Sequence, residues 1–182
     1  MPPPPLTPTG RVILGMIALG RQSGYDIKQF VDKSTRHFWA ASYGQIYPEL
    51  RRLEDAGLIT GQSEPTGGRA RTVYELTPAG RTALQDWLEP EADPMFEVRD
   101  ESMLKLFFSD IGTPEQRIAN IRAMRESHER TLAQLCSHEE QAAEMPAGPR
   151  LTLELGIGLH RGIVEWCAAT ERRLAEETNR AD

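Results

Sequence analysis

Residues 42–59 form the most informative stretch of the sequence and read SYGQIYPELRRLEDAGLI. Ser42 is a good N-cap, because its hydroxyl can accept a hydrogen bond from a free amide of the first helical turn. Gly57 supplies the left-handed residue on which many helices end. Between them, apolar residues recur at spacings of four and three and share one helical face: Ile46, Leu50 and Leu53. The stretch therefore predicts a helix over residues 43–56 with one buried face.

Two further helices are predicted before this stretch, and both are apolar on one side. Residues 7–19 carry a dense apolar stripe that Gly20 ends. A second helix opens at Ser23, where Asp26 stands in the position that completes a capping box. The first part of the chain is thus predicted to hold three consecutive helices.

A β-hairpin and a fourth helix are predicted after it. Residues 58–63 and 71–76 have strand composition, and residues 64–70 form a turn-rich tip that carries an arginine. Thr77 and Pro78 then open a helix that we expect to bury three side chains: Leu84, Trp87 and Leu88. The order of three helices, hairpin and helix is that of the winged helix-turn-helix, in which the third helix enters the major groove and the hairpin touches the DNA backbone.

The second half of the chain is predicted to be helical. Residues 89–94, EPEADP, suit a linker, and an apolar cluster follows over residues 98–108. One long helix is expected from Thr113 to about residue 143 and another from residue 151 to residue 177. The apolar stripe of the last helix is read as Leu151, Leu155, Leu159, Gly162 or Ile163, Trp166 and Ala169. Two such helices have more apolar surface than a small winged domain can cover, so a second subunit is the natural cover.

The fold class expected is therefore mainly α, with a winged helix-turn-helix domain over residues 1–90 and a helical dimerisation domain over residues 91–182. Three glycines in the last helix (Gly156, Gly158 and Gly162) each cost helix propensity, which suggests close approach of another helix, although a simple bend is an alternative.

Charge is distributed unevenly along the chain. The 182 residues carry a formal net charge of −6. Residues 1–81 hold ten Lys/Arg and seven Asp/Glu, a balance of +3, and residues 82–182 hold eleven and twenty, a balance of −9. Only the front is expected to meet a polyanion.

Several function classes find no support in the sequence. There is no apolar run long enough for a membrane span and no secretory signal, and the two cysteines are too few for a disulfide framework, so a reduced cytoplasmic setting is expected. The four histidines lack metal-ligand spacing, and His128 and His160 lie on or near apolar stripes. Because nucleophile, phosphate-cradling and metal motifs are missing, neither an enzyme nor a cofactor is expected.

Several stretches resemble the PadR family of transcriptional regulators. They are Ile13-Leu14-Gly15, Ser23-Gly24-Tyr25-Asp26-Ile27, the Ser42–Leu50 segment, Arg52-Leu53-Glu54 with Gly57-Leu58-Ile59, and Tyr74-Glu75-Leu76-Thr77-Pro78-Ala79-Gly80. The resemblance is looser in the second half, which is similar to the subgroup with a virulence-activator-like C-terminal region. It implies a homodimer on a pseudo-palindromic operator, and repression relieved by a small-molecule effector.

One departure from the family stands at Tyr43, where a small residue is common, so base preferences are not transferred. The residues expected to contact double-stranded DNA are Ser42, Tyr43, Gln45, Tyr47, Arg51, Arg69 and Arg71. Gln45 is expected at adenine edges, and Tyr47 and the arginines at phosphates.

Alternatives remain at several of these positions. Arg51 and Arg52 suit ion pairs with neighbouring carboxylates, Tyr47 suits the core, and Gln45 suits an ordinary surface position. A winged-helix protein-interaction module that does not bind DNA is the alternative function. An effector pocket between the halves is a further alternative, but most of the aromatic residues that could line it are expected in the core instead. These residues are Trp39, Trp87, Phe96, Phe107, Phe108 and Trp166.

Overall fold

The computed structural model describes residues 5–66, 69–90 and 98–181 of the chain, with the side chains of residues 65–70 and 178–182 outside that description. The chain divides into two compact units, Met1–Pro94 and Met95–Asp182. Each unit has its own apolar core. Within the described ranges, no helix is long and apolar enough to cross a membrane.

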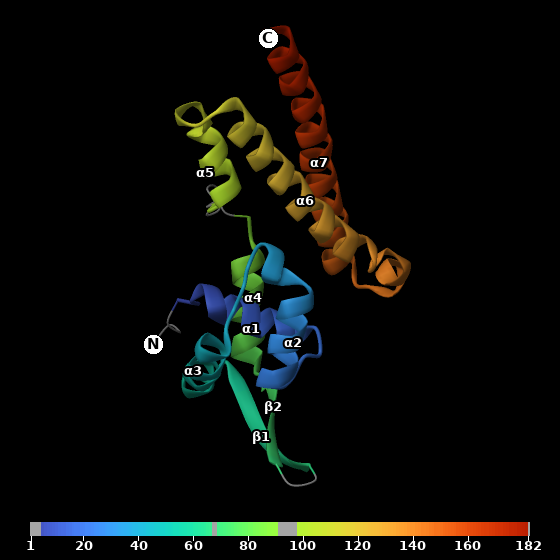
Figure 1. Cartoon of the computed structure of the whole chain (residues 1–182). Coiled ribbons are helices and arrows are strands. Elements are labelled where there is room, and N and C mark those ends of the chain that lie inside the picture. The colour runs from blue at the N-terminus through green and yellow to red at the C-terminus, as the bar shows by residue number, and fades with distance from the viewer. Residues whose placement is uncertain (1–4, 67–68, 91–97, 182) are drawn as a thin grey trace. The chain divides into compact units, whose positions relative to one another are not determined.

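The first unit is built on three helices that enclose one core (Figure 1). They are α1 (Pro8–Ala18), α2 (Gly24–Lys33) and α3 (Tyr43–Asp55), with a short 3₁₀ turn, η1 (Thr35–His37), after α2. The side chains of the central residues are inaccessible to solvent: Ile13, Leu14, Ile27, Val31, Ile46, Leu50 and Leu53. The apolar face predicted for residues 43–56 is thus confirmed as buried.

The hairpin consists of β1 (Ile59–Thr66) and β2 (Arg69–Leu76), which pair antiparallel from Ile59 opposite Leu76 to Thr66 opposite Arg69. We call residues 59–76 the wing. The strands are longer than predicted, because the expected tip over residues 64–70 contributes to both of them. Pro65 stands opposite Ala70 in this ladder. A proline is tolerated there because each strand of a two-stranded sheet is an edge strand.

The fourth helix, α4 (Pro78–Leu88), closes the unit, and the winged-helix order predicted from the sequence is confirmed. Leu84 packs against the core as expected. The prediction for the end of the helix is wrong, since Leu88 is 67% exposed and Trp87 is 37% exposed, with the Arg11 guanidinium 5.6 Å from the Trp87 ring. The helix runs past the edge of the small core before it ends.

Helices make up most of the described part of the second unit. Its elements are α5 (Glu101–Phe107), η2 (Ser109–Ile111), α6 (Pro114–Cys136), η3 (Glu139–Glu144) and α7 (Ala147–Ala181). The helix expected to reach residue 143 ends at Cys136, because residues 139–144 wind as a 3₁₀ helix. The last helix begins earlier than expected, at Ala147, because Pro149 lies in its first turn, where a missing amide costs little.

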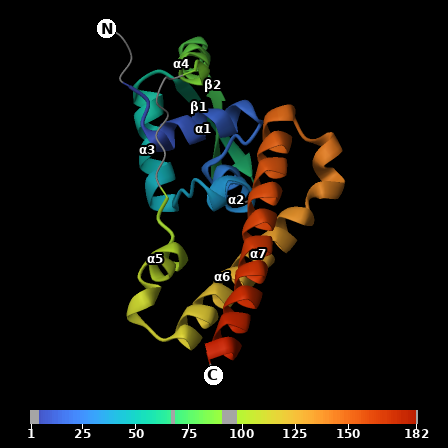
Figure 2. The ribbon, with the colours of Figure 1, turned by 90° about the horizontal axis from the view of Figure 1, so that it is seen from above.

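Helices α6 and α7 lie side by side in both views of the ribbon (Figures 1 and 2). Ile121, Met124 and Cys167 form the buried cluster between them. The stripe read from the sequence of α7 lies on a different face, since four of its side chains are exposed by 46–73%: Leu151, Leu155, Leu159 and Trp166. We call these four residues the α7 leucine stripe. Helix α7 therefore has two apolar faces, and the second unit by itself covers one of them.

Candidate nucleic-acid interface

The exposed side of α3 carries a row of three side chains, one turn apart. Tyr43, Tyr47 and Arg51 follow one another at spacings of four, on the face next to that of the buried Ile46 and Leu50. The rings of Tyr43 and Tyr47 are stacked, with centroids 6.1 Å apart and planes inclined by 18°. They are 44% and 45% exposed. The structure therefore presents two stacked phenols and a guanidinium on one accessible helix face.

The tyrosine stack is held from the side by α2. A methyl group added at Gly24 would lie 2.8 Å from the Tyr47 ring, so the ring packs directly on this glycine. The ammonium of Lys28, one turn further along α2, lies 5.5 Å from the centre of the Tyr43 ring. A cation near a ring face is attracted to the ring electrons, so Lys28 supports the position of Tyr43. The Tyr47 ring is thus packed on one side while its surface is still half exposed, and its contact with phosphate stays a prediction.

Gln45 caps the N-terminus of α3 together with Ser42. Its Oε1 accepts a hydrogen bond from the backbone N–H of Ser42, at 2.9 Å, and another from the Ser42 hydroxyl, at 3.1 Å. These two bonds occupy both lone pairs of the amide oxygen and leave its NH₂ group as the part of the side chain that can still donate. Sequence reasoning identified Ser42 as the cap but missed that Gln45 completes a capping box with it.

The two neighbouring arginines of α3 differ in their surroundings. Arg52 binds the carboxylate of Glu49 through Nε, at 3.0 Å from each oxygen, and through Nη2, at 2.6 Å from Oε1. The Thr7 hydroxyl donates to the same carboxylate at 2.5 Å. The hydrogen bonds from Arg52 lower the pKa of Glu49 despite its partial burial, and Glu49 in turn raises the pKa of Arg52. The ion-pair alternative therefore holds for Arg52, whereas Arg51 is exposed to solvent.

The wing carries the remaining two predicted residues. Arg71 on β2 forms an ion pair with Asp26 on α2, whose carboxylate also accepts from the Ser23 hydroxyl at 2.8 Å. Arg71 is still 48% exposed. Arg69 begins β2, and its side chain lies outside the described residues. The pairing of Arg71 with Asp26, which is 45 residues away in sequence, had no local signal.

The chain is similar to known transcriptional regulators along most of its length. The model described as "Transcriptional regulator PadR-like family" matches residues 13–86, and that described as "Virulence activator alpha C-term" matches residues 98–175. The chain is 32% identical to the negative transcriptional regulator PadR of Bacillus subtilis over 167 residues, which are 85% of this chain and 90% of that protein. It belongs to the PadR-like family of transcriptional regulators.

Solved structures agree with the PadR-like assignment. The crystal structure of Bacillus subtilis PadR in complex with operator DNA has a TM-score of 0.81 at 29% identity, covering 90% of this chain and 97% of that one. The Vibrio cholerae virulence activator AphA has a TM-score of 0.64 at 27% identity, covering 94% and 98%. The family resemblance read from the sequence is confirmed, in both halves of the chain.

The described aromatic residues considered for an effector pocket are divided between the two units. Trp39 and Trp87 belong to the first unit, and Phe107, Phe108 and Trp166 belong to the second. Phe96 lies outside the described residues.

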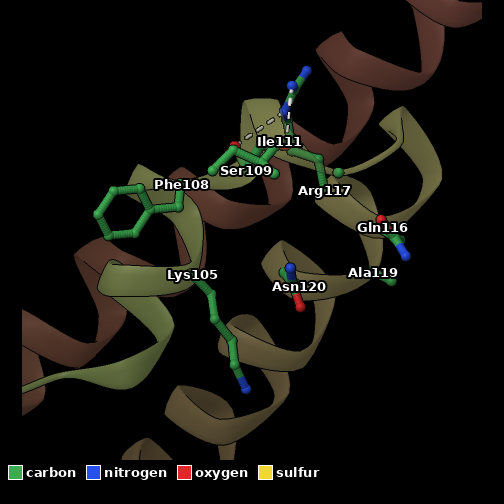
Figure 3. Close-up of a pocket in the computed structure, with 9 residues that line it drawn as sticks. Lys105, Phe108, Ser109, Ile111, Gln116, Arg117, Ala119 and Asn120 are labelled. Carbon is green, nitrogen blue, oxygen red and sulfur yellow. Dashed lines mark hydrogen bonds between the residues drawn. The ribbon is translucent and has the colours of Figure 1, made fainter.

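Phe108 borders a pocket of about 470 Å³ formed by α5, η2 and α6 (Figure 3). The cations at this pocket are already paired. Arg117 donates to the Ser109 hydroxyl and to Asp110, and Lys105 binds Glu101.

Proposed function

We propose that this chain is a dimeric repressor that binds a pseudo-palindromic operator in double-stranded DNA through α3 and the wing. The observation that carries the proposal is the exposed row of Tyr43, Tyr47 and Arg51 on α3, in a chain similar to a PadR solved with operator DNA. A helix with its polar side open and a β-hairpin beside it is the arrangement with which winged helix-turn-helix proteins dock on the major groove. In this proposal the first unit is the DNA-binding domain.

The seven predicted residues have distinct roles in the proposal. Tyr47 and Arg51 on α3 contact phosphates. Arg69 and Arg71 contact the flanking DNA backbone from the wing. To do so, Arg71 leaves its ion pair with Asp26 and binds a phosphate instead. The phenol of Tyr43 reaches base edges at the helix start. Ser42 holds the Oε1 of Gln45, so Gln45 contacts DNA as a donor through its NH₂ group. Its partners are then purine acceptors such as N7, and the bidentate contact to adenine applies only after release of the cap.

Dimerisation is assigned to the second unit. The α7 leucine stripe exposes four large apolar side chains, and adjoining positions on α7 carry Gly158 and Gly162, around which an added methyl group would meet nothing within 4 Å. Small residues beside exposed leucines suit the close approach of a helix from a second copy. Monomers seldom leave a stripe of this kind uncovered. Two copies joined here would present two copies of α3 to the two halves of an operator.

Control by an effector completes the proposal. Bacillus subtilis PadR was solved with p-coumaric acid, in a structure 29% identical to this chain with a TM-score of 0.76. We expect this chain to act in the cytoplasm, by binding rather than by turnover, and to release DNA when a small molecule binds.

The experiment is selection of bound duplexes from a random DNA pool, with the wild-type chain and with Gln45→Ala. The wild type should enrich a two-fold symmetric motif. The variant should keep the motif but lose preference at one position in each half-site, where a purine acceptor is required. An unchanged motif removes Gln45 from the interface. Absence of any enriched duplex contradicts the DNA-binding proposal and favours a protein-interaction module.

A further inference from the structure

An acidic side chain lies at the junction of α2 with the wing. Asp26 stands in the first turn of α2, and β2 passes close to this turn, since the N–H of Tyr74 donates to the carbonyl oxygen of Gln22 at 2.7 Å. Arg71, three residues before Tyr74 on β2, reaches the Asp26 carboxylate. The carboxylate therefore binds a guanidinium that the proposed function assigns to a DNA phosphate.

Two hydrogen bonds with Ser23 fix the position of the Asp26 carboxylate. The Ser23 hydroxyl donates to Oδ2 of Asp26 at 2.8 Å, and the N–H of Asp26 donates to the Ser23 hydroxyl at 3.2 Å. Ser23 itself is buried, with 4% of its surface exposed. Asp26 therefore keeps its place when Arg71 leaves it.

The ion pair is one that Arg71 can leave. Among the described residues, a single contact joins the two side chains, from Nη2 of Arg71 to Oδ2 of Asp26. The side chains are 48% and 30% exposed, so solvent screens their attraction. The Arg52–Glu49 pair differs, because it has three contacts and the Glu49 side chain is 11% exposed. DNA can therefore recruit Arg71, whereas Arg52 stays with its carboxylate.

The charge of the pair determines what it does beside DNA. An intact Arg71–Asp26 pair is neutral as a unit, so it releases no counterion from the phosphate backbone. It also keeps a carboxylate near the phosphates, and like charges repel. If Arg71 moves to a phosphate instead, the guanidinium contributes to binding, but the ion pair is lost and the carboxylate is left beside a polyanion. Asp26 lowers the affinity for DNA in both cases.

We propose that Asp26 competes with DNA phosphate for Arg71 and thereby lowers the affinity of this chain for DNA of any sequence. The inference rests on the proposed function, because it requires the wing to contact the DNA backbone. Phosphate contacts carry no sequence information, so Asp26 should weaken binding to operator and to unrelated DNA by the same factor. Asp26 is then a positioning residue that acts through Arg71, and it makes release of the operator easier.

The test measures the affinity of the full chain for two labelled duplexes, a selected operator and an unrelated sequence of the same length, by fluorescence anisotropy at several salt concentrations. Asp26→Asn keeps an oxygen that accepts from the Ser23 hydroxyl but removes the charge. The variant should bind both duplexes roughly 3–30-fold more tightly than the wild type, since neither subunit of a dimer has an ion pair to break. Its slope of log K against log salt should be steeper by about 1–2, because no carboxylate retains a cation beside the DNA.

Three further variants make the result specific. Asp86→Asn removes the same charge from α4, outside the predicted interface, and should bind like the wild type. Asp26→Gln is a second neutral variant, because glutamine suits the same capping position, and it should bind as tightly as Asp26→Asn. In an Arg71→Ala background, Asp26→Asn should gain less affinity, because no guanidinium is released. Thermal unfolding shows that each variant is folded.

Equal or weaker binding by both neutral variants would overturn the inference, and operator binding by the wild type would then leave the proposed function intact. An equal gain in the Arg71→Ala background would also overturn it, because charge repulsion alone would explain the effect. A wild type that binds neither duplex contradicts the proposed function itself. A structure of the wild type with operator DNA decides the point without variants: Arg71 should lie on a phosphate, and an intact Arg71–Asp26 pair would contradict the inference.

Discussion

Two neighbouring arginines on α3 show how a single position in a helix decides a side chain's role. Arg52 is three residues after Glu49, on the side that faces α1, and Thr7 reaches the same carboxylate. Arg51 is turned to solvent by the geometry of the helix. The sequence predicted that either residue could pair with a carboxylate, but it could not identify the pair, because Thr7 joins it from 42 residues away.

Arg52→Ala should therefore destabilise the chain. It leaves the Glu49 carboxylate, whose side chain is 11% exposed, without its main donor, at a cost of about 1–2 kcal/mol after allowance for solvent screening. Glu49 has a lowered pKa, so its contribution is present at neutral pH and is lost as pH falls through the folded-state pKa. Urea unfolding at pH 7 measures the loss, and Arg51→Ala is the matched control, which should change stability by less than about 0.5 kcal/mol. Equal effects from the two variants would contradict the assignment.

Elements were predictable where their signals are local. Ser23, Ser42, Thr77 and Thr113 were identified as starts of helices, and each precedes one in the structure. Periodicity alone did not decide which face of α7 packs on α6, because the leucine stripe and the buried residues Ile157 and Cys167 both repeat at helical spacing. A repeat shows that a face is apolar, but only packing shows which face meets α6. The ion pair between Arg71 and Asp26 was unpredictable as well, because the two residues are 45 positions apart and meet only through packing.

The junction of α4 with β1 depends on one glycine. A methyl group added at Gly80 would lie 2.0 Å from the backbone oxygen of Leu58, and backbone cannot move aside as a flexible side chain can. Gly80→Ala should therefore lower the free energy of unfolding by about 3 kcal/mol or more. Gly15→Ala in α1, where nothing lies within 4 Å, is the control and should be neutral or stabilising by up to about 1 kcal/mol. Similar Tm values for the two variants would show that the contact is not as close as described.

At the scale of the whole molecule, the sequence predicted a second copy because two apolar faces exceed what one chain can cover. The exposed side chains of the α7 leucine stripe form the apolar face that a second copy would cover. Leu155→Gln/Leu159→Gln should turn a dimer into a monomer, because roughly 1.5–3 kcal/mol per leucine is lost for each side chain that a partner would bury. Sedimentation at micromolar concentration measures the mass. A double variant that stays dimeric would place the interface on another surface.

The same double variant should retain its helical content, because Leu155 and Leu159 are 73% and 60% exposed within one chain. Circular dichroism at neutral pH checks this, and a large loss of helix would mean that the two leucines support the fold of the single chain. The comparison separates a failure of folding from a failure of association. Binding to an operator should weaken with dissociation, because each half-site then binds alone.

The most direct test of DNA binding by α3 is the salt dependence of operator affinity for the wild type and Arg51→Ala. Fluorescence anisotropy of a selected operator, titrated at several salt concentrations, gives the slope of log K against log salt. If each subunit contributes one Arg51–phosphate contact, the variant should bind more weakly and its slope should be shallower by about 2. Arg122→Ala, on α6, should leave the slope unchanged. An Arg51→Ala protein with wild-type affinity and slope would contradict the account.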